Sequence, residues 1–192
     1  YMNDPQYRED LLLNKDGQNA MWNRCFWQGY PIGSAMKPAV ALAALQEGVI
    51  DTSTQFRCGY TYYNADMPDF HPLCMGTHGY LNVIEALTVS CNIFFYDTGY
   101  NLGIDNMNLY QRKLGLGELT GVEIYESDGT LAGPDEKEDW YGGDTIMAAI
   151  GQSDNLITPV QLATYAATIA NNGTRLRTHV VYKITDYSRQ TV

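Results

Sequence analysis

The sequence predicts an α+β fold in which helices predominate and strands are few and short. Several apolar stretches are bounded by capping residues or glycine, as buried helices are, whereas two short runs at 122–125 and 180–184 are apolar and β-prone. With 192 residues and 45% hydrophobic content the chain can bury one core, and no internal repeat indicates a second domain.

The first predicted helix follows a polar, turn-rich stretch at 1–28. The turn-forming residues 30–33 precede an apolar run at 38–45, and Gly48 ends that run. Because the run is apolar on every face, we expect a central, buried helix.

A loop region at 51–78, rich in Gly, Tyr, Asp and Pro, separates this helix from the next. The next helix is predicted at 83–89, where Asn82 is a plausible N-cap and Glu85 stands three residues later. This spacing is typical of a capping box, in which each side chain bonds to the other residue's backbone N–H.

A further helix is predicted from Ile93 to Gly103, and the helical pattern continues to Leu114. After it come the strand-like run at 122–125 and an acidic loop at 135–139.

The last helix is predicted to begin at Pro159, which suits the first helical position. Thr158 is its N-cap and Gln161 completes a capping box, and the helix should end near 171–173. We expect a strand at 180–184 after it.

The charge balance of the chain excludes some classes of partner. Its formal net charge is −10 and its estimated pI is 4.5, which argues against binding nucleic acid or an anionic membrane surface. A solvated acidic face is the ordinary meaning of such a balance. The sequence contains no apolar run long enough to span a bilayer.

Ser34 and Lys37 form an S-x-x-K pattern at the start of the buried helix. Backbone N–H groups in the first turn lack intrahelical partners and could stabilise the oxyanion formed when Ser34 attacks a carbonyl. Lys37 lies three residues on, and if desolvated its amine can act as a base toward the Ser34 hydroxyl. The structural alternative is a capping serine beside a solvated lysine.

Ser90 and Asn92 form a second pattern, S-x-N, between two predicted helices. In an extended link these alternate residues would point the same way. Ser90 could relay a proton to a leaving amine, and the Asn92 amide could hold a substrate peptide group. Ordinary helix capping by both residues is the alternative.

A rival S-x-N occurs at Ser153-Asp154-Asn155. Its middle aspartate is also found in class A β-lactamases. We interpret it as coincidence, because it lies 119 residues beyond Ser34 and adjoins the helix predicted to start at Pro159.

Taken together and in order, these motifs resemble the transpeptidase domain of class B penicillin-binding proteins, of the cell-elongation type. Several ordered motifs at family-like spacing are far more specific than any one of them. The resemblance runs from about Asn23 to Val181 and is carried by 34–37, 78–81, 86–87, 90–96, 150–152, 158–161 and 169–173.

The resemblance implies the fold of serine β-lactamases and penicillin-binding transpeptidases, a central antiparallel sheet with a helical subdomain. It implies that the D-Ala-D-Ala end of a peptidoglycan stem peptide acylates Ser34, that D-Ala leaves, and that the acyl group passes to an amine of a neighbouring strand. Lys37 and Ser90 would complete the catalytic set, Asn92 would bind substrate, and β-lactams would trap the acyl-enzyme. It implies no cofactor and no metal.

The resemblance also implies a setting. We expect the protein at the extracytoplasmic face of a bacterial membrane, anchored by a segment outside this chain, with a cell-wall glycosyltransferase as partner of the full-length protein.

One departure from the family pattern is serious. The third motif, Lys-Thr-Gly or Lys-Ser-Gly on a strand, does not occur in the sequence. Residues 113–115 spell Lys-Leu-Gly without the hydroxyl, and residues 15–17 spell Lys-Asp-Gly ahead of Ser34. We therefore expect 1–192 to be a truncated, partial transpeptidase domain, inactive alone, with the missing motif downstream of Val192.

The cysteines allow more than one interpretation. In an oxidising compartment Cys58 and Cys74 would form a disulfide, and in an anaerobe they would stay free. The absence of C-x₂₋₄-C and H-x₃₋₅-H pairs argues against zinc, so His78 is interpreted as structural. Cys91 should point inward as a small apolar residue, and Cys25 should be a packing residue.

Two other functions remain open within the same fold. A catalytically inactive scaffold would not need Ser34, Lys37, Ser90 and Asn92 together. A β-lactamase would need an added base for deacylation, and no E-x-x-x-N element is present, but a β-lactam sensor would not.

Overall fold

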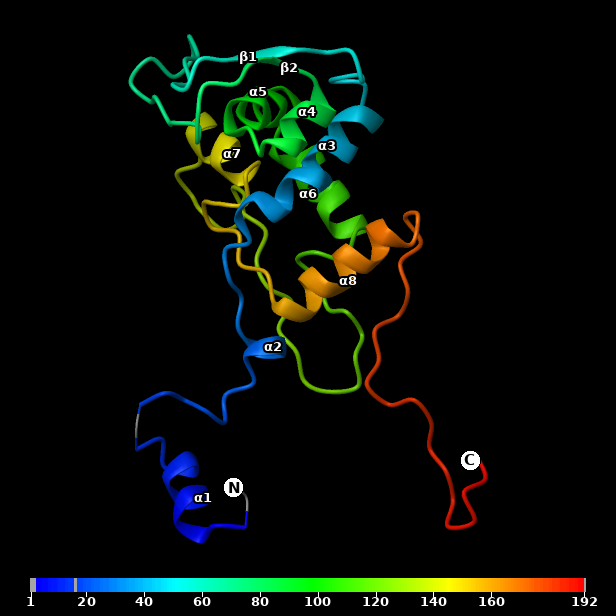
Figure 1. Ribbon diagram of the computed structural model, residues 1–192. Helices are drawn as coiled ribbons and strands as arrows, with labels where there is room; N and C mark the ends of the chain where they lie inside the picture. Colours follow the sequence, from blue (N-terminus) through cyan, green and yellow to red (C-terminus); the bar gives the residue numbers. More distant parts are fainter. Residues whose placement is uncertain (1–2, 16, 192) are drawn as a thin grey trace.

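The computed structural model describes residues 3–15 and 17–191, and its elements are arranged as an elongated body with most helices at one end (Figure 1). The helices and strands, in chain order, are α1 (Pro5–Leu12), α2 (Arg24–Trp27), a 3₁₀ turn η1 (Gly33–Met36), α3 (Lys37–Gln46), β1 (Phe56–Cys58), β2 (Gly79–Leu81), α4 (Val83–Thr88), α5 (Asn92–Leu102), α6 (Ile104–Lys113), α7 (Gly142–Ala148) and α8 (Pro159–Ala170).

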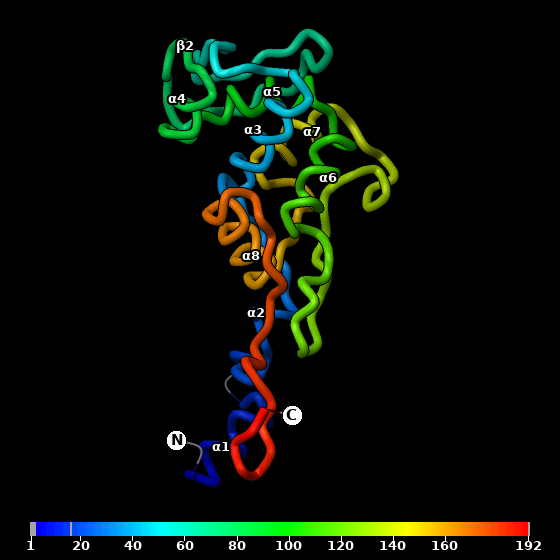
Figure 2. The backbone as a smooth tube through the Cα atoms, turned by 90° about the vertical axis from the view of Figure 1, so that its right-hand side faces the viewer, coloured from blue at the N-terminus to red at the C-terminus, as the bar shows by residue number. Residues whose placement is uncertain are grey.

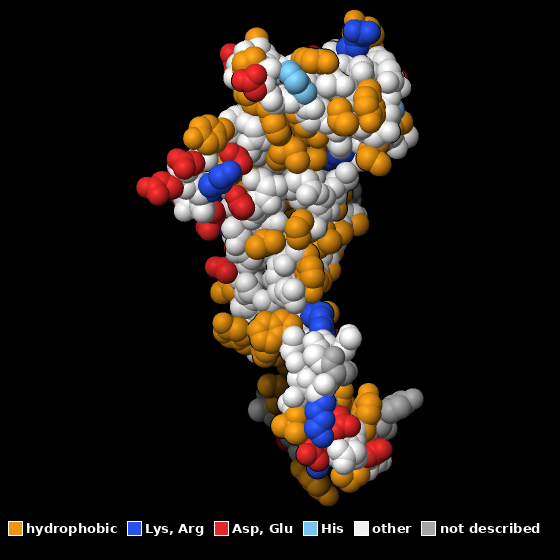
Figure 3. Space-filling model, turned by 90° about the vertical axis from the view of Figure 1, so that its left-hand side faces the viewer, with side chains coloured by type: hydrophobic (Ala, Val, Ile, Leu, Met, Phe, Trp, Pro, Cys, Tyr) orange, Lys and Arg blue, Asp and Glu red, His pale blue; other side chains and the backbone are white. Residues whose placement is uncertain are grey.

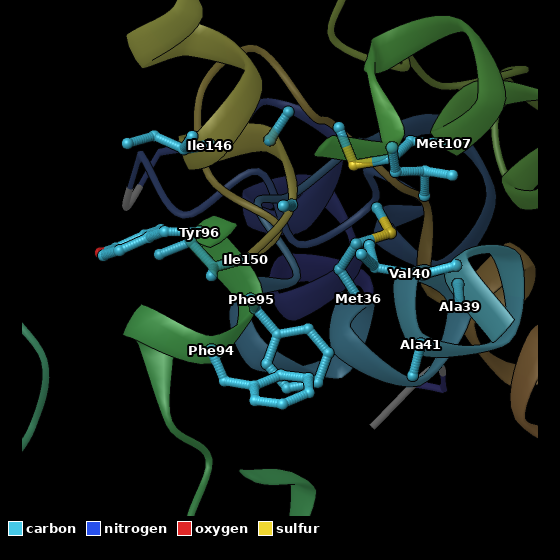
Figure 4. Packing of buried hydrophobic residues seen from close by; sticks show 14 of the residues in the cluster. Met36, Ala39, Val40, Ala41, Phe94, Phe95, Tyr96, Met107, Ile146 and Ile150 are labelled. Carbon is cyan, nitrogen blue, oxygen red and sulfur yellow. The ribbon is translucent and has the colours of Figure 1, made fainter. Parts of the chain in front are cut away.

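The core lies where α3, α5, α6 and α7 meet. Figure 4 shows Phe94 and Phe95 of α5 beside Met36 and Val40, with Met107 of α6 closing the other side. These side chains are at most 1% exposed. The predicted central helix is thus confirmed as α3, although one of its apolar residues, Leu42, is 45% exposed.

A two-stranded antiparallel sheet covers α5 at the upper end of the molecule (Figure 1). Phe56 pairs with Leu81 and Cys58 pairs with Gly79. Phe56 packs on α5 through Phe94, with ring centroids 5.2 Å apart.

The α+β class is confirmed, but the two strands predicted by composition are wrong. Residues 122–125 and 180–184 are irregular. A strand needs a neighbour for its backbone groups. In the described part of the chain neither segment has a paired strand, and Val180, Tyr182 and Ile184 are exposed.

The predicted helix boundaries are confirmed where capping chemistry defines them. At α4, Asn82 accepts from the backbone N–H groups of Ile84 and Glu85, and the Glu85 carboxylate accepts from Asn82 N–H. Helix α5 ends at Gly103, whose φ of 80° is readily adopted only by glycine.

The capping box of α8 is also present and does more than close the helix. Gln161 is fully buried, and its Oε1 accepts from Thr158 N–H at 3.1 Å. Its Nε2 donates to the carbonyls of Glu118 and Asp128 at 2.7 and 2.6 Å. One side chain therefore ties α8 to the irregular segment between α6 and α7.

Both ends of the described chain lie at the lower end of the body, away from the sheet (Figures 1 and 2). Helix α1 and the C-terminal segment are well separated there in Figure 1. Acidic side chains gather along one edge of the upper part in Figure 3, in keeping with the net charge. Among the residues described, no helix is both long and apolar enough to cross a membrane.

Candidate active site

Ser34 lies on the 3₁₀ turn η1, directly before α3, and it is exposed. The turn exists because Gly33 adopts a φ of 55° and Pro38 favours the first turn of the helix that follows. Within the described residues the Ser34 backbone N–H has no hydrogen-bond partner. It is therefore available to stabilise an oxyanion at this position.

Lys37 begins α3 and is 1% exposed. Its Nζ donates to Ser90 O at 2.7 Å, to Ser90 Oγ at 3.0 Å and to Asn92 Oδ1 at 2.7 Å, and it lies 5.6 Å from the Phe95 ring centroid. Burial lowers the pKa of this amine to about 8, while the electrostatic influence of nearby Cys74 and Cys91 opposes the shift. The expectation of a desolvated lysine is confirmed.

Ser90 and Asn92 reach Lys37 by a different geometry from the one predicted. Ser90 has a φ of 53°, in the left-handed region, and Asn92 is the first residue of α5. The link is therefore a sharp turn rather than an extended segment. The turn directs the Ser90 carbonyl and hydroxyl, with the Asn92 amide oxygen, at one ammonium group.

Ser90 connects Lys37 to Ser34. Its Oγ donates to Ser34 Oγ at 3.0 Å and accepts from Lys37 Nζ at 3.0 Å. In the described part of the chain, no direct hydrogen bond joins Lys37 to Ser34. Lys37, the predicted base, therefore connects to Ser34 through the Ser90 hydroxyl.

This arrangement can move a proton. Hydroxyl hydrogens rotate, so with a neutral amine the same contacts can run from Ser34 O–H to Ser90 Oγ and from Ser90 O–H to Lys37 Nζ. Attack by Ser34 on a carbonyl would then place its proton on Lys37, and the reverse path would deliver a proton to a leaving group. The four predicted residues thus form one site.

The rival motif lies outside this site. Asn155 is fully buried, and its amide bonds only to backbone: Oδ1 accepts from Ala132 N–H, and Nδ2 donates to the carbonyls of Ala148 and Gln152. Ser153 has a φ of 60° in a turn. These residues hold a loop together and, within the described chain, make no hydrogen bond to a residue of the site. This agrees with the interpretation of the second S-x-N as a coincidence.

The described residues of the segments that came nearest to the third motif lie outside the site. Lys113 ends α6, and its amine lies over the Tyr110 ring at 4.5 Å from the centroid. Of the earlier segment, Asp16 lies outside the described residues.

A second cluster lies directly behind the S-x-N turn. Cys58, Cys74, His78 and Cys91 place one potential ligand atom each within 4.8 Å of all the others. The four cysteines of the described chain are all free, so of the two alternatives for Cys58 and Cys74 the disulfide is wrong and the free thiols agree with the structure. Cys25 is exposed, so its prediction as a packing residue is wrong too.

The spacing of the cluster fits a tetrahedral metal. In a tetrahedral site, Zn²⁺ bonds of about 2.3 Å to sulfur and about 2.0 Å to nitrogen place two sulfurs about 3.8 Å apart and a sulfur and a nitrogen about 3.5 Å apart. Here Cys74 Sγ lies 3.8 Å from Cys91 Sγ, and His78 Nδ1 lies 3.5 Å from Cys58 Sγ and 3.6 Å from Cys74 Sγ. A Cys₃His set is a common closed zinc site.

Sequence spacing missed this cluster because the fold assembles it. Cys58 enters from β1 opposite Gly79, the residue after His78. Cys91 enters from the S-x-N turn. The available local signal was the three-residue gap between Cys74 and His78, which a search for Cys–Cys and His–His pairs passes over.

The cluster is attached to the catalytic turn. Cys91 stands between Ser90 and Asn92, and it is fully buried, as predicted. The Asn92 backbone N–H donates to Cys74 Sγ at 3.2 Å, and Asn92 Nδ2 donates to Leu73 O at 3.3 Å. An interaction that fixes the positions of these sulfur atoms therefore also fixes the turn that carries Ser90 and Asn92.

The whole chain, residues 1–192, matches the family model described as the penicillin binding protein transpeptidase domain. It is 35% identical over 182 residues to the peptidoglycan D,D-transpeptidase MrdA of Acinetobacter baumannii, a match covering 91% of this chain and 27% of that protein. The chain thus spans about a quarter of the length of this curated relative.

Solved structures of similar fold agree. The complex of the penicillin-binding protein PBP2 with MreC from Helicobacter pylori matches with a TM-score of 0.83 at 27% identity, covering 97% of this chain and 35% of that chain. The ceftriaxone acyl-enzyme complex of penicillin-binding protein A from M. tuberculosis matches with a TM-score of 0.80 at 25% identity, covering 98% and 42%.

Proposed function

The chain belongs to the penicillin-binding protein transpeptidase domain family, and from this premise we propose that it carries the acyl-serine site of a peptidoglycan D,D-transpeptidase. The observation that carries the proposal is the hydrogen-bonded series from Lys37 through Ser90 to Ser34. Relatives named for this activity, such as MrdA, support it.

Each residue has a role in the proposed reaction. Ser34 attacks the carbonyl of the penultimate D-Ala of a stem peptide, its proton passes through Ser90 to Lys37, and its backbone N–H faces the developing oxyanion. Collapse of the tetrahedral adduct expels D-Ala, which takes up the proton. An amine of a neighbouring strand then attacks the ester and regenerates Ser34. Asn92 binds a peptide group of the substrate.

The same ester explains inhibition by β-lactams. Opening of the lactam ring would leave an acyl group on Ser34 with its leaving amine still tethered, so that release is slow. The acyl-enzyme structure of penicillin-binding protein A supports this step.

We propose a cellular location and a partner by analogy with the same family. The protein would work at the extracytoplasmic face of a bacterial membrane, anchored by a segment outside this chain, in elongation of the cell wall. A glycosyltransferase is the proposed partner, by analogy with relatives solved with MreC and in a peptidoglycan synthase complex.

The test is release of D-Ala from an acyl-D-Ala-D-Ala peptide, with and without an amine acceptor. We expect the full-length protein to release D-Ala and to form the cross-linked product when acceptor is present. Ser34→Ala should do neither, whereas Ser153→Ala should behave as the unaltered protein. Specific, saturable peptide binding without D-Ala release or penicillin acylation would favour the inactive scaffold. Penicillin acylation of Ser34 without any release of D-Ala from the peptide would favour the sensor.

We further propose that Cys58, Cys74, His78 and Cys91 hold one Zn²⁺. The tetrahedral spacing of their ligand atoms supports this, as does the set of donors. Hydrogen bonds from the Gly76, Ile93 and Asn92 backbones lower the pKa of Cys74 although its burial opposes this, and so favour the thiolate that a metal requires. The ion would act structurally, because all four ligands come from protein.

The amount of zinc bound per chain tests this second proposal. Protein purified from zinc-replete cells should contain one zinc per chain, and Cys58→Ser should lose most of it. Cys25→Ser is the matched control, since Cys25 is exposed and outside the cluster. Metal-free protein with all four thiols open to a thiol reagent would contradict the proposal.

A further inference from the structure

The turn that carries Ser34 is held from two sides by groups outside the proton relay. On one side, the backbone N–H of Gly33 donates to Gly151 O at 3.0 Å. On the other, the Tyr165 hydroxyl donates to Ala35 O at 3.1 Å. Both chain neighbours of Ser34 are therefore hydrogen-bonded to distant parts of the chain.

The contact with Gly151 is between backbones. A Cβ placed at Gly151 would lie 2.2 Å from Gly33 O and 2.8 Å from Gly33 N, and the φ of Gly151 is 72°. The turn is thus packed directly against the end of α7 and cannot move further toward it.

Tyr165 lies on the buried face of α8. Gln161, Thr164, Tyr165 and Thr168 recur at helical spacing on its inner face, and Tyr165 is 3% exposed. Burial raises the pKa of Tyr165 to about 12, so its hydroxyl is protonated over the working pH range and can donate. Gln161 fixes α8 itself through its bonds to Glu118 O and Asp128 O.

Neither η1 nor α3 has a side-chain N-cap that could orient the turn locally. Ser34 Oγ must nevertheless stay 3.0 Å from Ser90 Oγ, while its backbone N–H faces the reacting carbonyl oxygen. Small displacements of reacting groups cost large factors in rate.

We propose that Tyr165 is a positioning residue for acylation of Ser34, holding the Ser34 turn against the backbone of Gly151 through the carbonyl of Ala35. The proposal rests on the function proposed above and adds a residue that the relay does not include. Among the described residues Tyr165 makes no hydrogen bond to the side chains of Ser34, Ser90 or Lys37, so removing its hydroxyl should change the rate of acylation and leave the proton path intact.

The experiment compares Tyr165→Phe with the unaltered full-length protein by stopped-flow acylation with a fluorescent penicillin. Phenylalanine keeps the buried ring and removes one hydrogen bond, so the folded, labelled fraction should be unchanged. The acylation rate constant at saturating penicillin should fall by about threefold to tenfold, the range expected for one net hydrogen bond. The penicillin concentration at half saturation and the pH profile should not move.

Tyr110→Phe is the matched control, because it removes a tyrosine hydroxyl bond to Glu47 far from the turn. It should acylate at the unaltered rate. An unchanged rate constant for Tyr165→Phe, or a loss confined to the labelled fraction, would overturn the inference and leave a purely structural tyrosine. Failure of the unaltered protein to label would instead contradict the proposed function.

Discussion

Lys37 is the residue on which the chemistry of the site depends. The sequence allowed a desolvated amine to be predicted, because an S-x-x-K pattern opened an apolar run. It did not indicate that the amine would use Ser90 O, Ser90 Oγ and Asn92 Oδ1 as partners at once. That detail depends on the positive φ of Ser90, and local sequence signals do not specify such a value for a serine.

Acylation by a β-lactam should become faster as pH rises through about 8. Burial lowers the pKa of folded Lys37 to about 8, so the neutral amine that accepts a proton grows from about a tenth of the protein at pH 7 to about half at pH 8. The second-order acylation rate constant, measured from pH 6 to 9.5, should rise and then level off. A rate that is flat or falling between pH 7 and 9 would contradict the role given to Lys37.

Ser90→Ala should slow acylation by about 10²- to 10⁴-fold, the usual contribution of a proton-transfer group. The substitution interrupts the only hydrogen-bonded path between Lys37 and Ser34 that the described residues provide. Labelling rates with a fluorescent penicillin would measure it. Ser153→Ala is the control, since Ser153 shares the S-x-N pattern and a positive φ. Equal slowing in both variants would mean that the effect is not specific to the relay.

Helix boundaries were predictable because capping signals are local. Asn82 with Glu85, and Thr158 with Gln161, stand within one turn of the helices they start. The predictions of strands at 122–125 and 180–184 failed because β-propensity indicates only that a segment can form a strand. It does not show that a neighbouring strand is available to pair with it. The thiol cluster was missed for a related reason: the register of β1 on β2 brings Cys58 to His78.

Gln161→Ala should lower the free energy of unfolding by about 2–4 kcal/mol, because it removes a fully buried side chain and leaves backbone groups of Thr158, Glu118 and Asp128 without their partner. Urea denaturation followed by circular dichroism would measure the change. The matched control is Gln46→Ala, at the exposed end of α3, which should change stability by less than about 0.5 kcal/mol. Similar losses at both positions would argue against the bridging role.

At the scale of the whole molecule, the helices that form the core also position the residues of the site. Helices α3 and α5 pack against each other, and each begins with residues of the site: Lys37 on α3 and Asn92 on α5. The order of motifs along the chain was enough to predict the family and the four residues that meet. The clamp on the Ser34 turn by Gly151 and Tyr165 was not predictable, because it joins segments more than 100 residues apart in sequence.

The central claim is that Ser34 is the nucleophile. The direct measurement is peptide mass mapping of the full-length protein after incubation with penicillin. We predict one adduct per chain, on the peptide that contains Ser34, and none in the Ser34→Ala variant. An adduct on Ser153 or on Cys91, or folded protein that remains unlabelled after long incubation, would contradict the account.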